Sequence, residues 1–267
     1  MKRPLLRHGG MWLAGLAWVL LAAPAWSGDI TVTVTGRVAH PGALTLPAGA
    51  RLNQAIAKAD VLPDAYVLGA AWLRPQLHKK QLRWKLAALF DAGVLRGQAR
   101  LDGRPALLAL ATRLQRAWQA LPVTGRERKA LLDLRPLEVS TRNHLLVAGD
   151  TIVYPSRPTT VRVVGAVKAP CVLAFVAMRK ARVYRQSCPL TASASKDWLY
   201  VIEPDGSVSR HGVALWNRDA GQVLAPGAVV YVPLARSVLP KAVRDSFNTD
   251  AVRFLSTQVL PVTGDSP

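Results

Sequence analysis

The sequence is poor in acidic residues: Asp and Glu number 16, against 35 Lys and Arg, in a chain of 267 residues. It also lacks His or Cys residues at the spacing of metal ligands, a serine nucleophile elbow and a glycine-rich phosphate loop. Apart from its N-terminal segment, it has no apolar run that approaches the length of a membrane span. These absences weaken the case for an enzyme, exclude a pure membrane protein, and leave no catalytic residue, metal or cofactor to expect.

The composition is that of a folded protein. Half of the residues are hydrophobic, enough to bury a core that offsets the entropy of ordering the chain. The 19 glycines and 19 prolines are spread along the chain, which excludes a collagen-like or low-complexity protein. A chain of this length forms one large domain or two of ordinary size.

The N-terminus has the features of a secretory signal peptide. It begins with a basic segment that contains Lys2, Arg3 and Arg7. The apolar run that follows, residues 11–23, is too short to span a bilayer as a stable helix. Small residues then fit cleavage before Trp26 or Gly28. We therefore predict a signal peptide over residues 1–27 and a periplasmic protein, with an uncleaved anchor as the alternative.

Cleavage at that point would leave 32 Lys and Arg against 16 Asp and Glu, a net charge of +16. Such a charge raises the question of nucleic acid, but export argues against it, so we expect no nucleic-acid partner. The anionic partners that a basic periplasmic protein meets are acidic polysaccharide, lipopolysaccharide phosphate and a membrane surface. The alternative is that the arginine content reflects coding bias and solubility, because charge alone specifies no ligand.

Two segments of the chain repeat each other. Residues 34–44 read VTGRVAHPGAL and residues 163–173 read VVGAVKAPCVL, so that Gly36 matches Gly165. Each copy follows a segment of alternating polarity, which predicts a half-buried strand, and its Gly and Pro mark the turn of a hairpin. The two copies also end alike, with LVAGDTIVYP at 146–155 and LAPGAVVYVP at 224–233.

The order of elements in each copy is typical of a β-grasp domain, a small mixed sheet packed on one helix. Residues 52–59 provide the helix of the first copy and residues 181–188 that of the second. Residues 198–202 and the segment from Val208 onward predict a hairpin around the turn Pro204-Asp205-Gly206.

We therefore predict an α+β protein of two tandem β-grasp domains, over residues 28–156 and 157–235, followed by a C-terminal amphipathic helix and tail over residues 236–267. Matching glycines are 113 residues apart in the first copy and 62 in the second, which indicates an insertion of about 51 residues in the first. Insertions are best tolerated in exposed loops. We place this one within about 66–143.

The insertion is predicted to be helical. One helix ends near Gly93 and carries apolar residues at helical spacing: Leu77, Leu82, Leu86, Leu89 and Phe90. A second helix begins near Pro105 and stops at Pro122. Between residues 66 and 143 there are 15 Lys and Arg against 5 Asp and Glu. This segment is either a basic surface for an anionic partner or a solvated helical face.

The two cysteines, Cys171 and Cys188, form a candidate disulfide. Export into an oxidising compartment favours the bond, whereas a cytosolic protein would carry free thiols. The bond would tie the hairpin of the second copy to the end of its helix, and the short loop predicts a stabilisation of about 3 kcal/mol.

The C-terminus predicts an amphipathic helix over residues 248–258, capped by Asn248 or Thr249. Its apolar side chains are candidates for docking on a partner or a membrane surface, in particular Phe247, Val252, Phe254 and Leu255. The alternative is that this helix packs back on the protein's own sheet.

Taken together, these features resemble those of the capsule-biosynthesis GfcC-like family. The paired modules of that family are similar to the soluble-ligand-binding (SLBB) β-grasp domains of outer-membrane polysaccharide-export proteins. The resemblance covers essentially all of the chain after residue 27. The segments that carry it are TGRVAHPG at 35–42, PVTGR at 122–126, Gly149-Asp150, PTTV at 158–161, EPDG at 203–206, Trp216-Asn217 and Pro226-Gly227. It implies a periplasmic, non-enzymatic accessory protein of capsule or exopolysaccharide assembly and export. Its partners would be an outer-membrane polysaccharide-export protein, acidic polysaccharide or both, with a peripheral membrane contact as a further option.

The resemblance directs attention to Arg126, with Thr124 beside it in PVTGR. A guanidinium in that turn could hold a carboxylate or phosphate through two hydrogen bonds; alternatively, it bonds loop carbonyls and is structural. Trp216 and Asn217 form a second candidate ligand site. Four tryptophans could stack on sugar rings, namely Trp72, Trp84, Trp118 and Trp216, although the helical spacing of Trp118 favours core packing.

Two rival functions stay open. A polysaccharide hydrolase or lyase would need two suitably spaced carboxylates, and the closest pair, Glu203 and Asp205, lies in a predicted turn. The chain could also be a structural component of another envelope secretion assembly.

Overall fold

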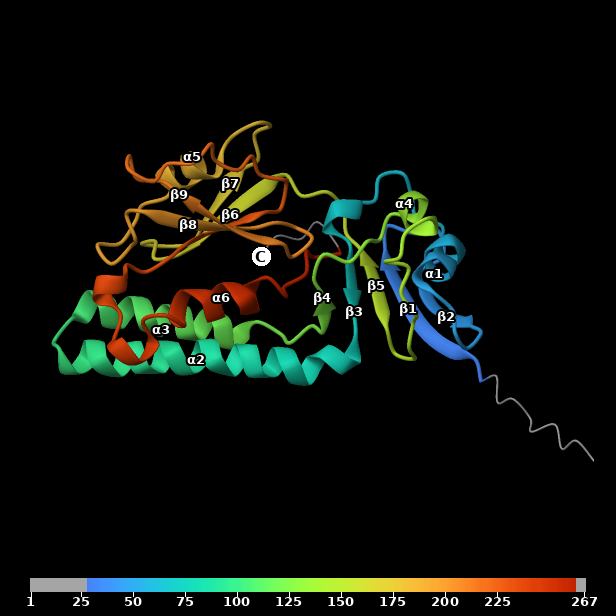
Figure 1. Cartoon of the computed structure of the whole chain (residues 1–267), viewed down its shortest axis with the longest axis horizontal. Helices are drawn as coiled ribbons and strands as arrows, with labels where there is room; N and C mark the ends of the chain where they lie inside the picture. Colours follow the sequence, from blue (N-terminus) through green and yellow to red (C-terminus); the bar gives the residue numbers. More distant parts are fainter. Residues whose placement is uncertain (1–27, 263–267) are drawn as a thin grey trace, which may run out of the picture.

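The computed structural model describes residues 28–262 and shows an α+β fold (Figure 1). It contains two five-stranded mixed sheets, one after the other along the chain, and six α-helices within the described residues. The signal peptide predicted at residues 1–27 lies outside that range. None of the helices in the described part is both long and apolar enough to cross a membrane.

The first sheet has the strand order β2-β1-β5-β3-β4. Its strands are β1 Ile30–Gly36, β2 Gly42–Leu46, β3 Ala71–Leu73, β4 Arg126–Glu127 and β5 Thr151–Tyr154. The central pair, β1 and β5, is parallel, and the other pairs are antiparallel. Helix α1, Leu52–Ala59, covers this sheet. Its buried residues recur at helical spacing and so form one apolar face, which packs in one core with the apolar residues of β1 and β5.

The second sheet repeats this topology with the order β7-β6-β10-β8-β9. Its strands are β6 Thr160–Gly165, β7 Cys171–Ala174, β8 Trp198–Ile202, β9 Val208–Gly212 and β10 Val229–Val232. Here β6 and β10 form the parallel central pair, and helix α5 spans Ala181–Gln186. The repeat predicted from the sequence is therefore a repeat of the same β-sheet topology.

The matched glycines occupy equivalent places in the two sheets. Gly36 has a φ of +95° and Gly165 a φ of +99°, in the region that only glycine adopts readily. A Cβ at Gly36 would overlap the backbone carbonyl of Tyr154, and one at Gly165 would overlap that of Val232. Glycine is required here because the chain turns into its hairpin while the parallel neighbouring strand passes close by.

The inserted helices lie between β3 and β4. Helix α2 spans His78–Leu101 and helix α3 spans Pro105–Ala120. The expected limits of about 66–143 were too wide, because β3 and β4 lie inside them and belong to the first sheet. The expected end of α2 near Gly93 was also wrong. Glycine costs only about 1 kcal/mol within a helix, and the burial of Leu95 and Ala99 beyond it outweighs that cost.

The inserted helices pack with the second sheet and not with the first. They share one core with that sheet and with helix α6, Phe247–Leu255, whereas the first sheet, α1 and α4 (Leu134–Glu138) have a core of their own. Figure 1 shows α2, α3 and α6 as a layer beneath the second sheet, with α5 above it. Four short 3₁₀ helices complete the described elements: Val67–Gly69, Pro75–Leu77, Arg236–Val238 and Lys241–Val243.

Helix α6 lies inside the molecule. It begins at Phe247 and ends at Leu255, slightly earlier than the predicted 248–258. Phe247, Val252 and Phe254 are buried, and Leu255 is half-buried. The Phe247 ring lies 5.7 Å from that of Trp118 on α3. These candidates for partner docking are thus occupied by the protein's own core, with α2 on one side and β8 on the other.

The predicted disulfide is present. Cys171 at the start of β7 and Cys188 just after α5 are joined with an S–S distance of 1.98 Å and a Cα–Cα distance of 6.0 Å. The bond ties the hairpin of the second sheet to the end of its helix, and it is compatible with an extracytoplasmic protein.

Candidate functional site

Two tryptophans and an arginine meet at the outer edge of the second sheet. Trp198 begins β8, Arg210 lies on the edge strand β9, and Trp216 lies on the loop that follows β9. The Trp216 side chain is 73% exposed and meets Trp198 edge to face, with ring centroids 6.3 Å apart and planes at 89°. The Arg210 guanidinium lies 4.2 Å from the Trp198 ring centroid. We call Trp198, Arg210, Trp216 and Asn217 the aromatic edge.

Asn217 holds the loop that presents Trp216. Its side-chain nitrogen donates to the Asp197 carbonyl at 3.0 Å, and its side-chain oxygen accepts from the Ala214 amide at 3.0 Å. The indole Nε1 of Trp216 donates to the Asp197 carboxylate at 3.2 Å. The polar atoms of these residues are therefore used within the protein, whereas much of the Trp216 ring remains open to solvent. Asn217 therefore positions the loop that carries Trp216.

The loop that carries Trp216 is also closed by an acid–histidine pair. The Asp219 carboxylate lies 2.9 Å from Nδ1 of His211, and Nε2 of His211 lies 2.8 Å from the Ser209 hydroxyl. Two arginines close to Trp216 in the sequence, Arg210 and Arg218, are exposed to solvent. The aromatic edge thus offers a flat apolar surface with cationic groups, the combination that suits a sugar ring bearing negative charge.

Arg126 lies in a closed junction between the two sheets. Its Nη1 donates to the Gln258 carbonyl at 2.7 Å, and its Nη2 donates to the carbonyls of Pro204 and, at 3.4 Å, Ala70. These acceptors belong to the segment after α6, the turn before β9 and the segment before β3. The side chain therefore has the structural role that the sequence left open, and it is not presented to an external carboxylate or phosphate.

Burial changes the protonation chemistry of this guanidinium. It lowers the pKa of Arg126 to about 10, partly opposed by the negative charge of Asp205. Thr124 lies beside it: its hydroxyl donates to the Thr257 carbonyl at 2.7 Å and accepts from the Arg126 amide at 3.1 Å. The structure thus brings Thr124 and Arg126 together. Their hydrogen-bond partners do not include any residue of the aromatic edge.

Gln81 of α2 completes the junction and was not singled out in the sequence. Its buried side chain donates to the Arg126 carbonyl at 2.8 Å and accepts from the Gly125 amide at 2.8 Å. No local pattern marks a glutamine for this role. Trp198 and Arg210 were also missed, although the sequence predicts their hairpin. The register of that hairpin in the structure brings Arg210 opposite Tyr200, within diagonal reach of Trp198.

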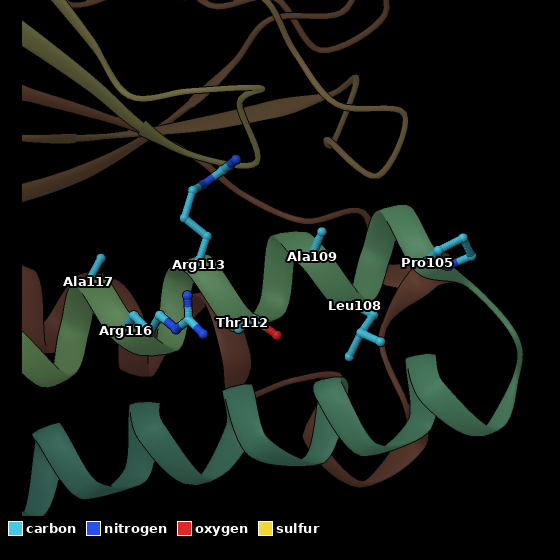
Figure 2. A pocket seen from close by; sticks show the side chains of 7 residues that line it. All are labelled: Pro105, Leu108, Ala109, Thr112, Arg113, Arg116 and Ala117. Atoms are coloured by element: carbon cyan, nitrogen blue, oxygen red, sulfur yellow. The ribbon is translucent and has the colours of Figure 1, made fainter.

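A cavity of about 630 Å³ runs along α3 (Figure 2). Small apolar side chains such as Ala109 and Ala117 line it, together with Arg113 and Arg116. Arg113 points across to the loop between β6 and β7, where it donates to the carbonyls of Val167 and Lys168. Burial lowers the pKa of Arg113. This arginine therefore fixes the helical layer to the second sheet.

A smaller cavity, of about 330 Å³, contains the carboxylate pair considered for hydrolysis. Glu203 accepts from the Gln222 side chain and the Ala225 amide, both at 3.3 Å, and Asp205 accepts from the Ser207 amide at 2.7 Å. Burial raises the pKa of Glu203. Asp205 thus holds the β8–β9 turn, and Glu203 ties the start of this turn to the segment before β10.

The other candidate tryptophans differ in their access to solvent. Trp72 and Trp118 are buried, so neither can stack on a sugar. Trp84 on α2 is half-buried, with Lys80, Arg128 and Arg253 within 6 Å of its ring. Residues 28–262 contain no group of three or more His, Cys, Asp or Glu side chains that could hold a metal ion.

Comparison with known proteins finds a family-model match in part of each module. Residues 169–260, from β7 to the segment after α6, match the family model described as "Capsule biosynthesis GfcC C-terminal". Residues 31–59, which contain β1, β2 and α1, match the SLBB domain.

A curated bacterial protein is also similar to this chain. The chain is 31% identical over 147 residues to "Uncharacterized protein YjbG" of Escherichia coli strain K12. This alignment covers 55% of the present chain and 59% of the relative, so the chain spans somewhat more than half of the length of that protein.

Proposed function

We propose, from the similarity of this chain to the GfcC C-terminal and SLBB family models, that it is a non-enzymatic accessory protein of capsule or exopolysaccharide assembly and export. Its family domains point to capsule biosynthesis and to polysaccharide binding in general. The finer proposal is that the protein works in the periplasm and binds acidic polysaccharide, an outer-membrane polysaccharide-export protein, or both.

The observation that carries the glycan proposal is the exposed ring of Trp216. The C–H face of a sugar ring is apolar, and an exposed indole supplies a flat apolar surface for it at little entropic cost. Because Trp198 and Asp197 already fix the indole, a ligand does not have to order it. The guanidiniums of Arg210 and Arg218, and the net charge of +16 that remains without residues 1–27, favour a glycan that carries carboxylates.

Binding of purified protein to two polymers tests this proposal. Alginate, a polymer of uronic acids, is expected to bind, and neutral dextran is expected to bind more weakly. Trp216→Ala should weaken alginate binding by about tenfold, as expected for a partly buried aromatic contact. Phe90→Ala, which removes another exposed aromatic ring far along the chain, is the matched control and should leave binding unchanged. Equal affinity of Trp216→Ala and wild type would refute the site.

Surface polysaccharide on cells tests the role itself. Cells that lack the gene should lose polymer from their surface, and the wild-type gene should restore it. A gene carrying Trp216→Ala should restore less, provided that the variant accumulates to the wild-type level. If surface polymer is unchanged in the deletion strain, the assignment to polysaccharide export is wrong. Copurification with an outer-membrane ring without glycan affinity would instead indicate a structural component of a secretion assembly.

A further inference from the structure

Helix α2 has apolar residues on two opposite faces, and only one face is covered. The covered face packs into the core through Ala88, Ala92, Leu95 and Ala99. On the opposite face, Leu82, Leu86 and Phe90 are 45%, 54% and 67% exposed. Their spacing of four residues places them along one line of the helix. We call these three residues the outer stripe; it is the part of the predicted helical pattern that does not enter the core.

Cations bracket the outer stripe at both ends. The helical period places three of them on the same face: Lys79 and Arg83 before the middle of the stripe, and Arg100 beyond it. All three are exposed, and within residues 28–262 none of them takes part in an ion pair. The one acid of α2, Asp91, is buried and accepts a hydrogen bond from the Ser246 hydroxyl at 2.7 Å. The outward face of α2 is thus apolar and cationic without a carboxylate.

The position of α2 leaves this face accessible. Figure 1 shows α2 along the boundary of the molecule, on the side of the helical layer away from the second sheet. Its 24 residues give a rod about 36 Å long. A long helix with a line of apolar side chains and flanking cations is suited to a planar surface whose outer layer is anionic and whose interior is apolar.

We propose that the outer stripe docks the protein on the surface of a bilayer that contains anionic phospholipid. Helix α2 lies parallel to that surface, with Leu82, Leu86 and Phe90 below the headgroups and the three cations Lys79, Arg83 and Arg100 at the phosphates. The charge of the face favours a bilayer as the partner. Lys and Arg side chains near its surface are attracted by the negative potential of acidic lipid, and the apolar side chains between them are stabilised in a hydrocarbon environment. The docking is independent of glycan binding at the aromatic edge.

Sedimentation with lipid vesicles tests the proposal. The chain starting at Gly28 is used, because both cores lie within residues 28–262 and the apolar segment 11–23 could itself bind lipid. It should sediment with vesicles of phosphatidylglycerol and phosphatidylcholine, and much less with phosphatidylcholine alone. Leu86→Ser/Phe90→Ser should weaken partitioning by about tenfold or more. Arg83→Gln/Arg100→Gln should weaken it by about fivefold per charge, with less dependence on salt.

A matched control separates the stripe from general surface hydrophobicity. Val139→Ser/Val172→Ser removes two other exposed apolar side chains and should leave vesicle binding unchanged. The proposal is overturned if the wild-type chain does not bind the anionic vesicles, or if the stripe variant binds them as well as wild type. It is also overturned if the chain is a dimer that Leu86→Ser/Phe90→Ser converts to monomer, since a second copy would then cover the face. Alginate binding should survive in the stripe variant, so failure here is distinguishable from failure of the glycan site.

Discussion

In the first sheet, residues 74–125 separate β3 from β4, whereas in the second sheet only residues 203–207 separate β8 from β9. The two sheets otherwise have the same strand order and the same parallel central pair. A hairpin turn at the sheet edge therefore accepts two complete helices without a change in topology, as expected for an exposed connection. The inserted helices bury their apolar faces against the second sheet and α6, so one module supplies the cover for the other.

The packing of helices from the first module on the sheet of the second is accompanied by hydrogen bonds that join the two modules. Arg126 links the first sheet to the β8–β9 turn and to the segment after α6. The Tyr66 hydroxyl donates to the Pro226 carbonyl at 2.9 Å, and the Lys129 amide donates to the Asp205 carbonyl at 2.9 Å. The β8–β9 turn is thus a point of contact between the modules. It is also the counterpart, in the second sheet, of the site at which the helices are inserted in the first.

Alanine at the matched glycines tests the equivalence of the two modules and should have the largest effect. Gly36→Ala and Gly165→Ala both place a Cβ against a backbone carbonyl at positive φ, which should cost about 4 kcal/mol or more of unfolding free energy. Urea unfolding followed by circular dichroism measures it. Gly97→Ala on α2, where a Cβ meets open space, should instead stabilise by about 1 kcal/mol. A mild effect at only one of the two matched positions would break the equivalence.

Removal of Arg126 tests the junction between the modules. Arg126→Ala should cost about 3 kcal/mol in the absence of any ligand, because it leaves buried carbonyls without donors. Arg142→Ala, at an exposed site, should change stability by less than about 0.5 kcal/mol. If Arg126→Ala keeps full stability but loses polysaccharide affinity, Arg126 contacts a ligand and the structural role is wrong.

The disulfide sharpens the comparison, since only the second module has one. Cys171→Ser/Cys188→Ser should lower stability by about 2 to 3 kcal/mol, because the unfolded chain loses the constraint of a closed loop. Hydrogen exchange should show faster opening of β7 and α5, with β1 and β2 unaffected. A uniform change across both sheets would mean that the modules unfold as one unit. Unchanged stability would show that the bond does not constrain the unfolded chain.

Much of the fold was predictable because its signals are local. The glycine and proline of each copy specify the hairpin turns, alternation specifies the strands, and residues 52–59 have the pattern of the helix that the structure shows there. The cysteine pair was predictable once the hairpin and the helix had been placed. At the candidate site, Trp216 and Asn217 could be named from the sequence, but not the ring of Trp198 against which Trp216 rests.

The apolar pattern of α2 shows the limit of such reasoning. Leu82, Leu86 and Phe90 identify a helix in the sequence, yet they are its exposed side, and smaller residues on the opposite side form the core contact. Periodicity detects an apolar face but does not say whether another part of the chain covers it. Likewise, the pattern of α6 is equally suited to a partner and to the core in which it lies.

The sequence by itself determined the repeated hairpins, their turns, helix α1 and the helical character of the insertion, because each depends on neighbouring residues or on a repeated pattern. It did not locate β3 and β4 or the end of α2. Only the tertiary structure decided that the inserted helices cover the second sheet, that Arg126 is buried among carbonyls, and that the outer stripe of α2 faces outward. Those outcomes depend on which distant surfaces fit together. Burial and hydrogen-bond satisfaction are properties of that whole packing, and no segment specifies them alone.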